Sequence, residues 1–183
     1  NEQRLLRAEA NGRGKVGAIQ TPEKAAKAVA RAALASDYPW TADQREAAKA
    51  LLTSQNRVTA VQGYAGTAKT TTVLATLAHE AAAQGYKITA LAPTASAART
   101  LGEALGTRGE TVAKHLMGQH SNATNGRSVW IVDEASMLSA RDTATLLESA
   151  EKANARGILV GDVKQLGSVG AGAAFAQLQG AGM

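Results

Sequence analysis

Residues Gly63 to Thr70 combine small side chains with a lysine and a threonine at a spacing that suits phosphate binding. Small residues let backbone N–H groups converge on phosphate oxygens, and the N-terminus of a helix adds positive potential. A strand is expected before this segment, at 57–62, and a helix after it, which is the context that such a loop requires. Lys69 would reach the β- and γ-phosphates, and the Thr70 hydroxyl would ligate Mg²⁺. The alternative is an ordinary turn of glycine and alanine before a helix.

One residue of this segment departs from the usual pattern. Ala68 stands directly before the lysine, where the pattern has glycine. Alanine reaches unusual backbone angles less readily than glycine, so we expect Ala68 to strain the loop by on the order of 1 kcal/mol. The residues expected to bind the nucleotide are Gln44, Gly63, Tyr64, Ala65, Gly66, Thr67, Ala68, Lys69, Thr70 and Thr71.

Two adjacent acids come directly after another apolar strand, expected at 128–132. Asp133 can hold Mg²⁺ through the water shell of the ion. Glu134 can orient and deprotonate an attacking water molecule. The alternative is a helix-capping acid and its neighbour. Together with the upstream loop, the pair favours attack of water on a bound phosphate.

A glutamine lies just beyond the strand expected at 156–160. Gln165 can hydrogen-bond a γ-phosphate and report its loss, which makes it a candidate sensor. A glutamine in a surface loop is more often only solvated, so the weight of this residue comes from its place beside the other two motifs.

Residues that could contact nucleic acid lie after the strand expected at 87–92. Pro93 ends that strand, and the Thr94 hydroxyl can grip a nucleic-acid phosphate or simply cap the next helix. His115, in a short helix that starts at Thr111, can touch a DNA strand, or it can be packed or solvated.

Gln44 also has two possible roles. The run from Thr41 to Gln44 fits a capping box, in which the glutamine side chain serves the start of a helix. Gln44 also precedes Lys69 by 25 residues, where a glutamine could read the adenine edge with both its donor and its acceptor.

Short apolar strands alternate with helical segments along most of the chain. Helices are expected at 69–83, 95–105 and 139–153, with a last one from about Ala173. This alternation predicts βαβ units, hence an α/β fold with a parallel sheet and helices on both faces. In such a sheet the binding crevice lies at the carboxyl ends of the strands, where the four polar loops would meet.

Residues 1–40 are expected to lead into the main domain, 41–183. The first fifteen or so are polar and interrupted by glycine, which favours a linker or a short docking arm. Thr21 and Pro22 then predict the start of a helix that runs to about Ala35.

The composition excludes several other classes. The chain has 183 residues, of which 45% are hydrophobic and none is cysteine, so a disordered chain, a disulfide scaffold and a cysteine-ligated metal site are excluded. No apolar run approaches the roughly 18–20 residues that span a bilayer, so we expect no membrane segment and a cytoplasmic protein. The net charge of +5 permits an anionic partner, with the basic excess in the first and middle portions. The aromatic content of 3% argues against binding single strands mainly by stacking.

Taken in order, these segments resemble motifs of the superfamily 1 DNA helicases, and within them the RecD-like 5′→3′ group. They are most similar to the helicase part of conjugative relaxases of the TraI/TrwC (MobF) type. Residues 61–66, 91–94, 133–137 and 161–166 match the Walker A, Ia, Walker B and III motifs of that family, and Gln44 matches its adenine-reading glutamine.

The resemblance implies a RecA-like P-loop NTPase lobe that binds ATP and Mg²⁺, the first lobe of two. In this family the second lobe supplies further DNA contacts and an arginine for the transferring phosphate; we expect that lobe to lie outside this chain. The expected partners are single-stranded DNA, the second lobe and relaxase domain of the same polypeptide, and the conjugative secretion machinery. The expected roles are catalysis by Lys69, Glu134 and Gln165, metal ligation by Thr70 and Asp133, and DNA contacts by Pro93, Thr94 and His115.

Two classes of function remain open from the sequence. One is the ATP-binding first lobe of a 5′→3′ DNA helicase in plasmid conjugative transfer, part of a bifunctional relaxase–helicase. The other is a helicase-like module that binds single-stranded DNA or a secretion-channel partner without hydrolysis. The intact lysine, threonine, acids and glutamine favour the first, whereas Ala68 and the missing second lobe favour the second. The acid pair and the Gln165 loop argue against a small-molecule kinase.

Overall fold

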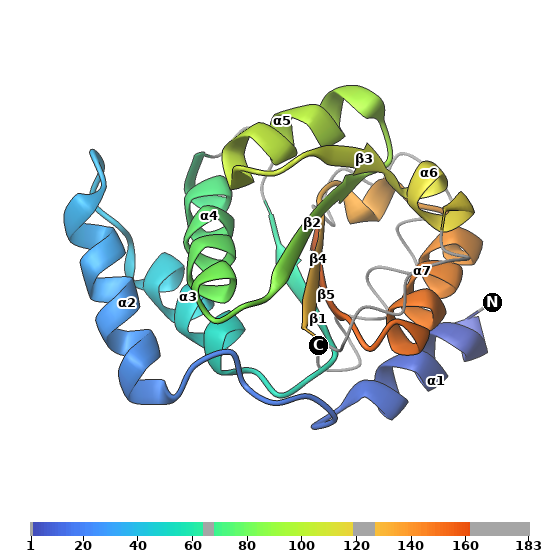
Figure 1. Ribbon diagram of the computed structural model, residues 1–183, viewed down its shortest axis with the longest axis horizontal. Helices are drawn as coiled ribbons and strands as arrows, with labels where there is room; N and C mark the ends of the chain where they lie inside the picture. Colours follow the sequence, from blue (N-terminus) through green and yellow to red (C-terminus); the bar gives the residue numbers. More distant parts are fainter. Residues whose placement is uncertain (1, 64–67, 119–126, 162–183) are drawn as a thin grey trace.

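The computed structural model describes residues 2–63, 68–118 and 127–161. Within these ranges five strands form one parallel sheet in the order β1-β5-β4-β2-β3 (Figure 1). The strands are β1 (Val58–Gln62), β2 (Lys87–Ala92), β3 (Gly109–Thr111), β4 (Ser128–Val132) and β5 (Arg156–Gly161). The helices are α1 (Glu2–Gly12), α2 (Pro22–Ala35), α3 (Ala42–Thr53), α4 (Ala68–Ala83), α5 (Ala95–Leu105), α6 (Val112–Met117) and α7 (Ala140–Lys152), with a 3₁₀ turn at Ala135–Met137.

The central strands are buried on both faces. Every residue of β4 and β5 is buried. Successive β4 side chains enter different cores, because Val129 and Ile131 belong to one cluster and Trp130 and Val132 to the other. Figure 1 shows α2, α3, α4 and α5 on one side of the sheet and α1, α6 and α7 on the other. The expected α/β, RecA-like fold with helices on both faces is confirmed.

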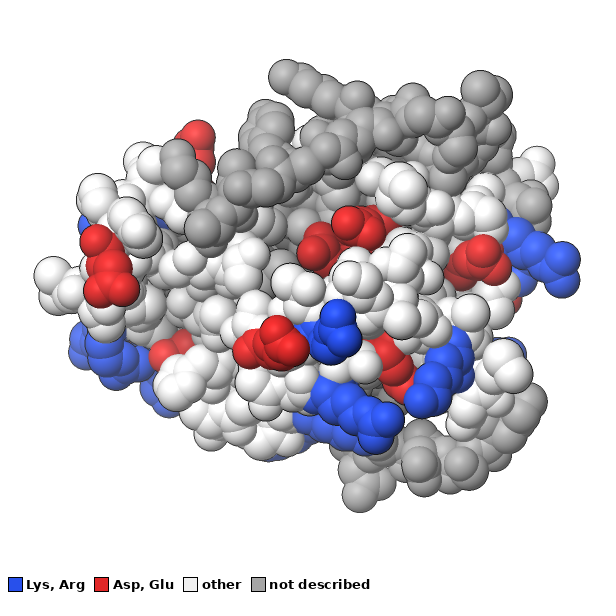
Figure 2. Space-filling model, turned by 90° about the horizontal axis from the view of Figure 1, so that it is seen from above, with Lys and Arg blue, Asp and Glu red and all other residues white. Residues whose placement is uncertain are grey.

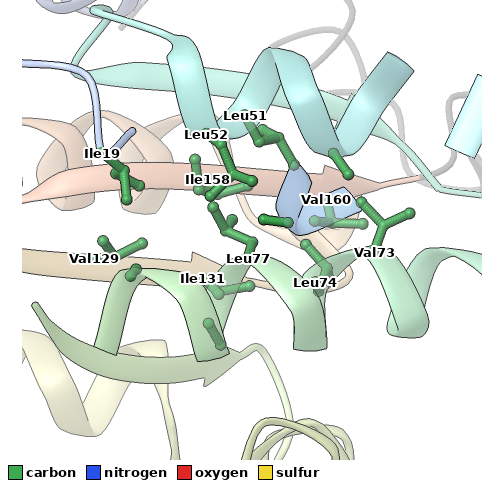
Figure 3. Packing of buried hydrophobic residues seen from close by; sticks show 14 of the residues in the cluster. Ile19, Leu51, Leu52, Val73, Leu74, Leu77, Val129, Ile131, Ile158 and Val160 are labelled. Atoms are coloured by element: carbon green, nitrogen blue, oxygen red, sulfur yellow. The ribbon is translucent and has the colours of Figure 1, made fainter. Parts of the chain in front are cut away.

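The core beneath α3 and α4 fixes the helix that comes after the phosphate-binding segment. Figure 3 shows Leu74 and Leu77 of α4 pointing at the sheet, beside Ile158 and Val160 of β5. Both leucines are almost fully buried, and each such side chain contributes about 1.5–3 kcal/mol to stability. The α4 helix is therefore held firmly over the sheet.

Of the two expectations for the first fifteen or so residues, the linker is wrong, because α1 forms a helix there, whereas a docking arm agrees with the packing of that helix against α7. Its buried positions, Leu5, Ala8, Glu9 and Gly12, recur at helical spacing and make one face. That face packs against α7, in the cluster that contains Trp130 and Val132. Arg4 also donates two hydrogen bonds, of 2.8 and 2.7 Å, to the Glu148 carboxylate. Few of these residues are large and apolar, which is why the helical pattern of this segment is weak.

The remaining helices begin close to where the sequence places them. Thr21 caps α2 by accepting a hydrogen bond from the Lys24 N–H, and Pro22 is the first helical residue, as expected. The short edge strand β3 was not expected. It lies against α5 because residues 102 and 109 are glycines: a Cβ on Gly109 would lie 1.7 Å from the Ala98 carbonyl oxygen. The last expected helix, from Ala173, lies outside the described residues.

Candidate nucleotide-binding site

The pairing of the strands brings the expected site residues to one border of the sheet, here called the carboxyl edge. Val132 of β4 pairs with Leu159 of β5, and Leu159 pairs with Ala60 of β1. On the other side of β4, Val132 pairs with Leu91 of β2. Asp133 directly follows β4. In this register it lies within about two residues of the position at which each of the strands β1, β5 and β2 ends. Neighbouring strands lie about 4.8 Å apart, so the ends of β1 and β4, which lead into Gly63 and Asp133, stand about 10 Å apart on either side of β5.

Gly63 begins the phosphate-binding segment and is fitted closely against β5. Its N–H donates to the Gly161 carbonyl oxygen at 2.9 Å, which extends the β1–β5 ladder by one bond. A Cβ at this position would lie 2.9 Å from Val160 Cγ1 and 3.7 Å from Thr70 Cγ2. Gly63 therefore lets the end of β1, the end of β5 and the start of α4 come together.

We expect the substitution Gly63→Ala to destabilise the fold by about 1–3 kcal/mol, because the added methyl group overpacks against a stiff β-branched neighbour. Gly157→Ala in β5 is the matched control, since a Cβ there meets nothing within 4 Å. Urea unfolding of both variants measures the difference. Equal stability of the two variants would show that the contact with Val160 relaxes without cost.

The helix after the segment begins at Ala68, so the backbone of Ala68 is helical. The expected strain at this residue is therefore wrong, since a helical backbone suits alanine as well as any residue. Thr70 lies half-buried in the first turn of α4, and Thr71 is exposed beside it. Tyr64, Ala65, Gly66 and Thr67 lie outside the described residues, as does the side chain of Lys69.

The helical backbone changes what we expect of the variant Ala68→Gly. It should bind a non-hydrolysable ATP analogue within about twofold of the unmodified chain, and lose at most ~1 kcal/mol of stability through its lower helix propensity. Calorimetric titration with the analogue checks the affinity. A tenfold gain in affinity would restore the idea that alanine strains this loop.

Asp133 and Glu134 leave the sheet in an unusual conformation. The Asp133 N–H donates to the Leu91 carbonyl oxygen at 2.9 Å, and Asp133 Oδ1 accepts the Glu134 N–H at 2.8 Å. Glu134 adopts the left-handed conformation, with φ 51° and ψ 34°, and its side chain is exposed. For a residue other than glycine this conformation costs roughly 1–2 kcal/mol.

A short turn holds Glu134 in this conformation. Ala135 and Ser136 are buried directly behind it, and the Met137 N–H donates to the Glu134 carbonyl oxygen at 2.9 Å. Strained residues of this kind cluster at functional sites, where the surrounding fold maintains them. The sequence indicated the two acids but carried no signal for the backbone that presents the second one to solvent.

Thr94 caps a helix in the structure, which is the structural one of its two expected roles. It is the N-cap of α5, and its Oγ1 accepts a hydrogen bond from the Ala97 N–H at 3.2 Å. The residue is exposed at the end of β2, next to half-buried Pro93, and its hydroxyl can still donate while it accepts. Contact of this pair with DNA stays a prediction.

His115 is packed rather than free at the surface. Its Nδ1 lies 2.7 Å from Glu110 Oε1, and its ring meets the Trp130 ring edge-on at a centroid distance of 4.5 Å. Only 14% of the side chain is exposed. These contacts give His115 a structural role in the last turn of α6, and a role in DNA binding stays a prediction.

Gln44 forms the capping box. Its Oε1 accepts the Thr41 N–H at 2.8 Å, while Thr41 Oγ1 accepts the Gln44 N–H at 3.2 Å. The amide oxygen thus already serves the start of α3, and recognition of adenine by Gln44 stays a prediction. Gln165 lies outside the described residues, and its role as a sensor stays a prediction.

Charges of both signs are mixed over the coloured residues in Figure 2, where acidic and basic side chains alternate. A broad basic field is therefore not formed by the described residues on that face. Any DNA contact there would rest on a few phosphate contacts, which carry position rather than sequence information.

The sequence model of one protein family, described as an AAA domain, matches residues 39–183. The chain belongs to this family. The chain is 34% identical over 143 residues to "Probable conjugal transfer protein TraA" of Sinorhizobium fredii, an alignment that covers 76% of this chain and 13% of that protein. It is 29% identical over 164 residues to "Conjugal transfer protein TraA" of Agrobacterium fabrum, covering 86% of this chain and 15% of that protein.

The chain also matches "RecBCD enzyme subunit RecD" of Mycolicibacterium smegmatis, with 38% identity over 167 residues, covering 74% of this chain and 30% of that protein. The resemblance to conjugative and RecD-like proteins is confirmed, and the AAA family supports nucleotide binding by this chain. The chain spans less than a third of each of these relatives. None of the described helices is long and apolar enough to cross a membrane.

Proposed function

We propose that this AAA domain is the ATP-binding first lobe of a 5′→3′ DNA helicase that acts in plasmid conjugative transfer as part of a relaxase–helicase. The observation that carries the proposal is that Gly63 and the start of α4 lie at the same border of the sheet as Asp133 and Glu134, on the two sides of the end of β5. Relatives that are conjugal transfer proteins and RecD subunits support the choice of process.

The side chains at this edge fit ATP with Mg²⁺. Mg²⁺ prefers hard oxygen ligands and is held by one or two carboxylates together with phosphates and water. Thr70 and Asp133 offer a hydroxyl and a carboxylate, and no group of three or more metal-ligating acids, histidines or cysteines occurs among the described residues. That modest donor set suits an ion that arrives with a nucleotide. When bound, Mg²⁺ would neutralise charge on the β- and γ-phosphates.

The residues of this chain divide the work of hydrolysis. The N-terminus of α4 and Lys69 would hold the phosphates, Thr70 and Asp133 would hold the metal, and Glu134 would accept the proton of the attacking water. The left-handed backbone at Glu134 and the buried residues behind it keep the carboxylate exposed at the edge. Gln165 senses whether the γ-phosphate is present.

The non-hydrolysing alternative drew part of its support from Ala68. Because Ala68 is helical, that residue gives no reason to expect weakened nucleotide binding. We therefore propose that this domain hydrolyses ATP. It would do so as part of a longer polypeptide that also contains a second lobe and a relaxase domain. Single-stranded DNA would pass Pro93 and Thr94, and the conjugative secretion machinery would receive the strand.

Strand displacement tests the proposed function and its direction. The longer polypeptide is given ATP and duplexes that carry either a 5′ or a 3′ single-stranded overhang. We expect release of the strand only from the duplex with the 5′ overhang. Release only from the 3′ overhang would reverse the direction, and release from neither, with DNA still bound, would favour the non-hydrolysing module.

A further inference from the structure

A second set of polar groups lies at the opposite border of the sheet, here called the amino edge. Arg57 directly precedes β1, Lys87 opens β2, Arg127 directly precedes β4 and Arg156 opens β5. Because the strands are parallel, these four cations lie along one border, away from the candidate nucleotide site. The proposed hydrolysis uses none of them.

Capping of helix ends explains part of this arrangement. The arginines donate to carbonyl oxygens at or just beyond the C-terminal ends of α7, α4 and α3, where positive charge is favourable. The contacts are Arg57 Nη1 to Ala155 at 3.2 Å, Arg127 Nη1 to Gln84 at 3.2 Å and Arg156 Nη1 to Ser54 at 2.6 Å.

Capping does not account for all of Arg156. Its side chain is 2% exposed, its Nη2 donates to the Gly17 carbonyl oxygen, and its buried Nε–H has no hydrogen-bond partner in the described part of the chain. No carboxylate among the described residues pairs with it. Burial lowers the pKa of Arg156, the phenol of Tyr86 acts in the opposite direction, and the charge of Arg57 adds to the lowering. A buried guanidinium without an anion is unfavourable.

A cavity of about 150 Å³ opens beside this guanidinium. Its polar lining consists of Lys15, Tyr86, Ser128, Asn154 and Arg156, with no carboxylate among them. Lys15 is exposed and forms no ion pair with any described residue. The Asn154 Oδ1 accepts a hydrogen bond from Arg57 at 3.0 Å, which leaves its NH₂ group as a donor toward the cavity. The lining thus offers two positive charges and several donors.

We propose that this cavity binds a tetrahedral oxyanion of the phosphate class. Lys15 and Arg156 supply charge-assisted hydrogen bonds, and the Tyr86 hydroxyl and the Asn154 amide supply neutral ones. The anion compensates the buried charge of Arg156. It comes either from free phosphate or from the backbone of a nucleic acid, and the proposal does not depend on nucleotide binding at the carboxyl edge.

Calorimetric titration with inorganic phosphate, at ionic strength held constant with chloride, tests the proposal. The titration uses the Lys69→Ala background, so that the phosphate-binding segment competes less. We expect saturable binding that Lys15→Gln weakens about tenfold, the effect of losing one charge-assisted hydrogen bond. Lys15 is chosen because Arg156 also holds two backbone carbonyls and its loss would disturb the fold. Lys27→Gln, an exposed lysine of α2, is the control and should leave the affinity unchanged.

The absence of saturable phosphate binding would overturn the proposal, as would equal affinities of the Lys15→Gln and Lys27→Gln variants. Fluorescence anisotropy with a labelled single-stranded oligonucleotide then separates the two sources. A weaker affinity of Lys15→Gln for the oligonucleotide as well as for phosphate supports a backbone phosphate in the cavity. A loss confined to inorganic phosphate supports a site for the free anion.

Discussion

Replacing Lys69 with alanine is expected to lower DNA-stimulated ATP hydrolysis by the longer polypeptide at least ~100-fold. The substitution removes the positive charge that faces the β- and γ-phosphates, where charge builds up during transfer, and loss of one such group costs about 10²–10³ in rate. Steady-state release of phosphate in the presence of single-stranded DNA measures the effect.

The matched control for this experiment is Lys27→Ala, which removes an exposed lysine from α2 on the outside of the domain. Its rate should equal that of the unmodified protein. Hydrolysis by Lys69→Ala within tenfold of the unmodified rate would be incompatible with a phosphate-binding role of Lys69, and with the motor function built on it.

Replacing Glu134 with glutamine is expected to stop turnover while nucleotide binding is retained. The amide keeps the size of the side chain and its exposed position but cannot accept the proton of the attacking water, and loss of a general base costs about 10²–10⁴ in rate. Calorimetric titration with a non-hydrolysable ATP analogue should give an affinity close to that of the unmodified protein.

Glu151→Gln serves as the control, because Glu151 is an exposed acid near the end of α7 and away from the carboxyl edge. Loss of nucleotide binding by Glu134→Gln, with the fold intact by circular dichroism, would show that Glu134 acts through structure rather than as a base.

The regular elements could be predicted because their signals are local. The strand β2 and the helix α5 have the predicted bounds, since an apolar run ends at Pro93 and Thr94 caps the helix after it. The short strand β3 could not be predicted, because it depends on two glycines that allow α5 to approach it. The helix α1 was missed for a related reason: its stability comes from packing on α7, which the sequence of residues 2–12 does not reveal.

The residues of the candidate site stay a prediction, and their arrangement could not be read from the sequence. Strand order places β5 between β1 and β4, a long-range pairing that no local pattern encodes. For Gln44, Thr94 and His115 the sequence left a structural role and a functional role open, and the structural contacts are those seen. A residue that caps a helix still has hydrogen-bond donors or acceptors that the cap does not use. The structural contacts therefore reduce what these side chains can offer to a nucleotide or to DNA, but they do not rule such contacts out.

ATP turnover with and without single-stranded DNA, measured side by side for residues 1–183 and for the longer polypeptide, tests the central claim most directly. An arginine from a second lobe is worth roughly 10³–10⁵ in rate at related phosphoryl-transfer sites. We therefore predict that DNA raises turnover of the longer polypeptide above about 1 s⁻¹, while residues 1–183 alone bind DNA weakly and stay far below that rate. A longer polypeptide that binds ATP and DNA but does not hydrolyse ATP would contradict the claim that this domain is part of a motor.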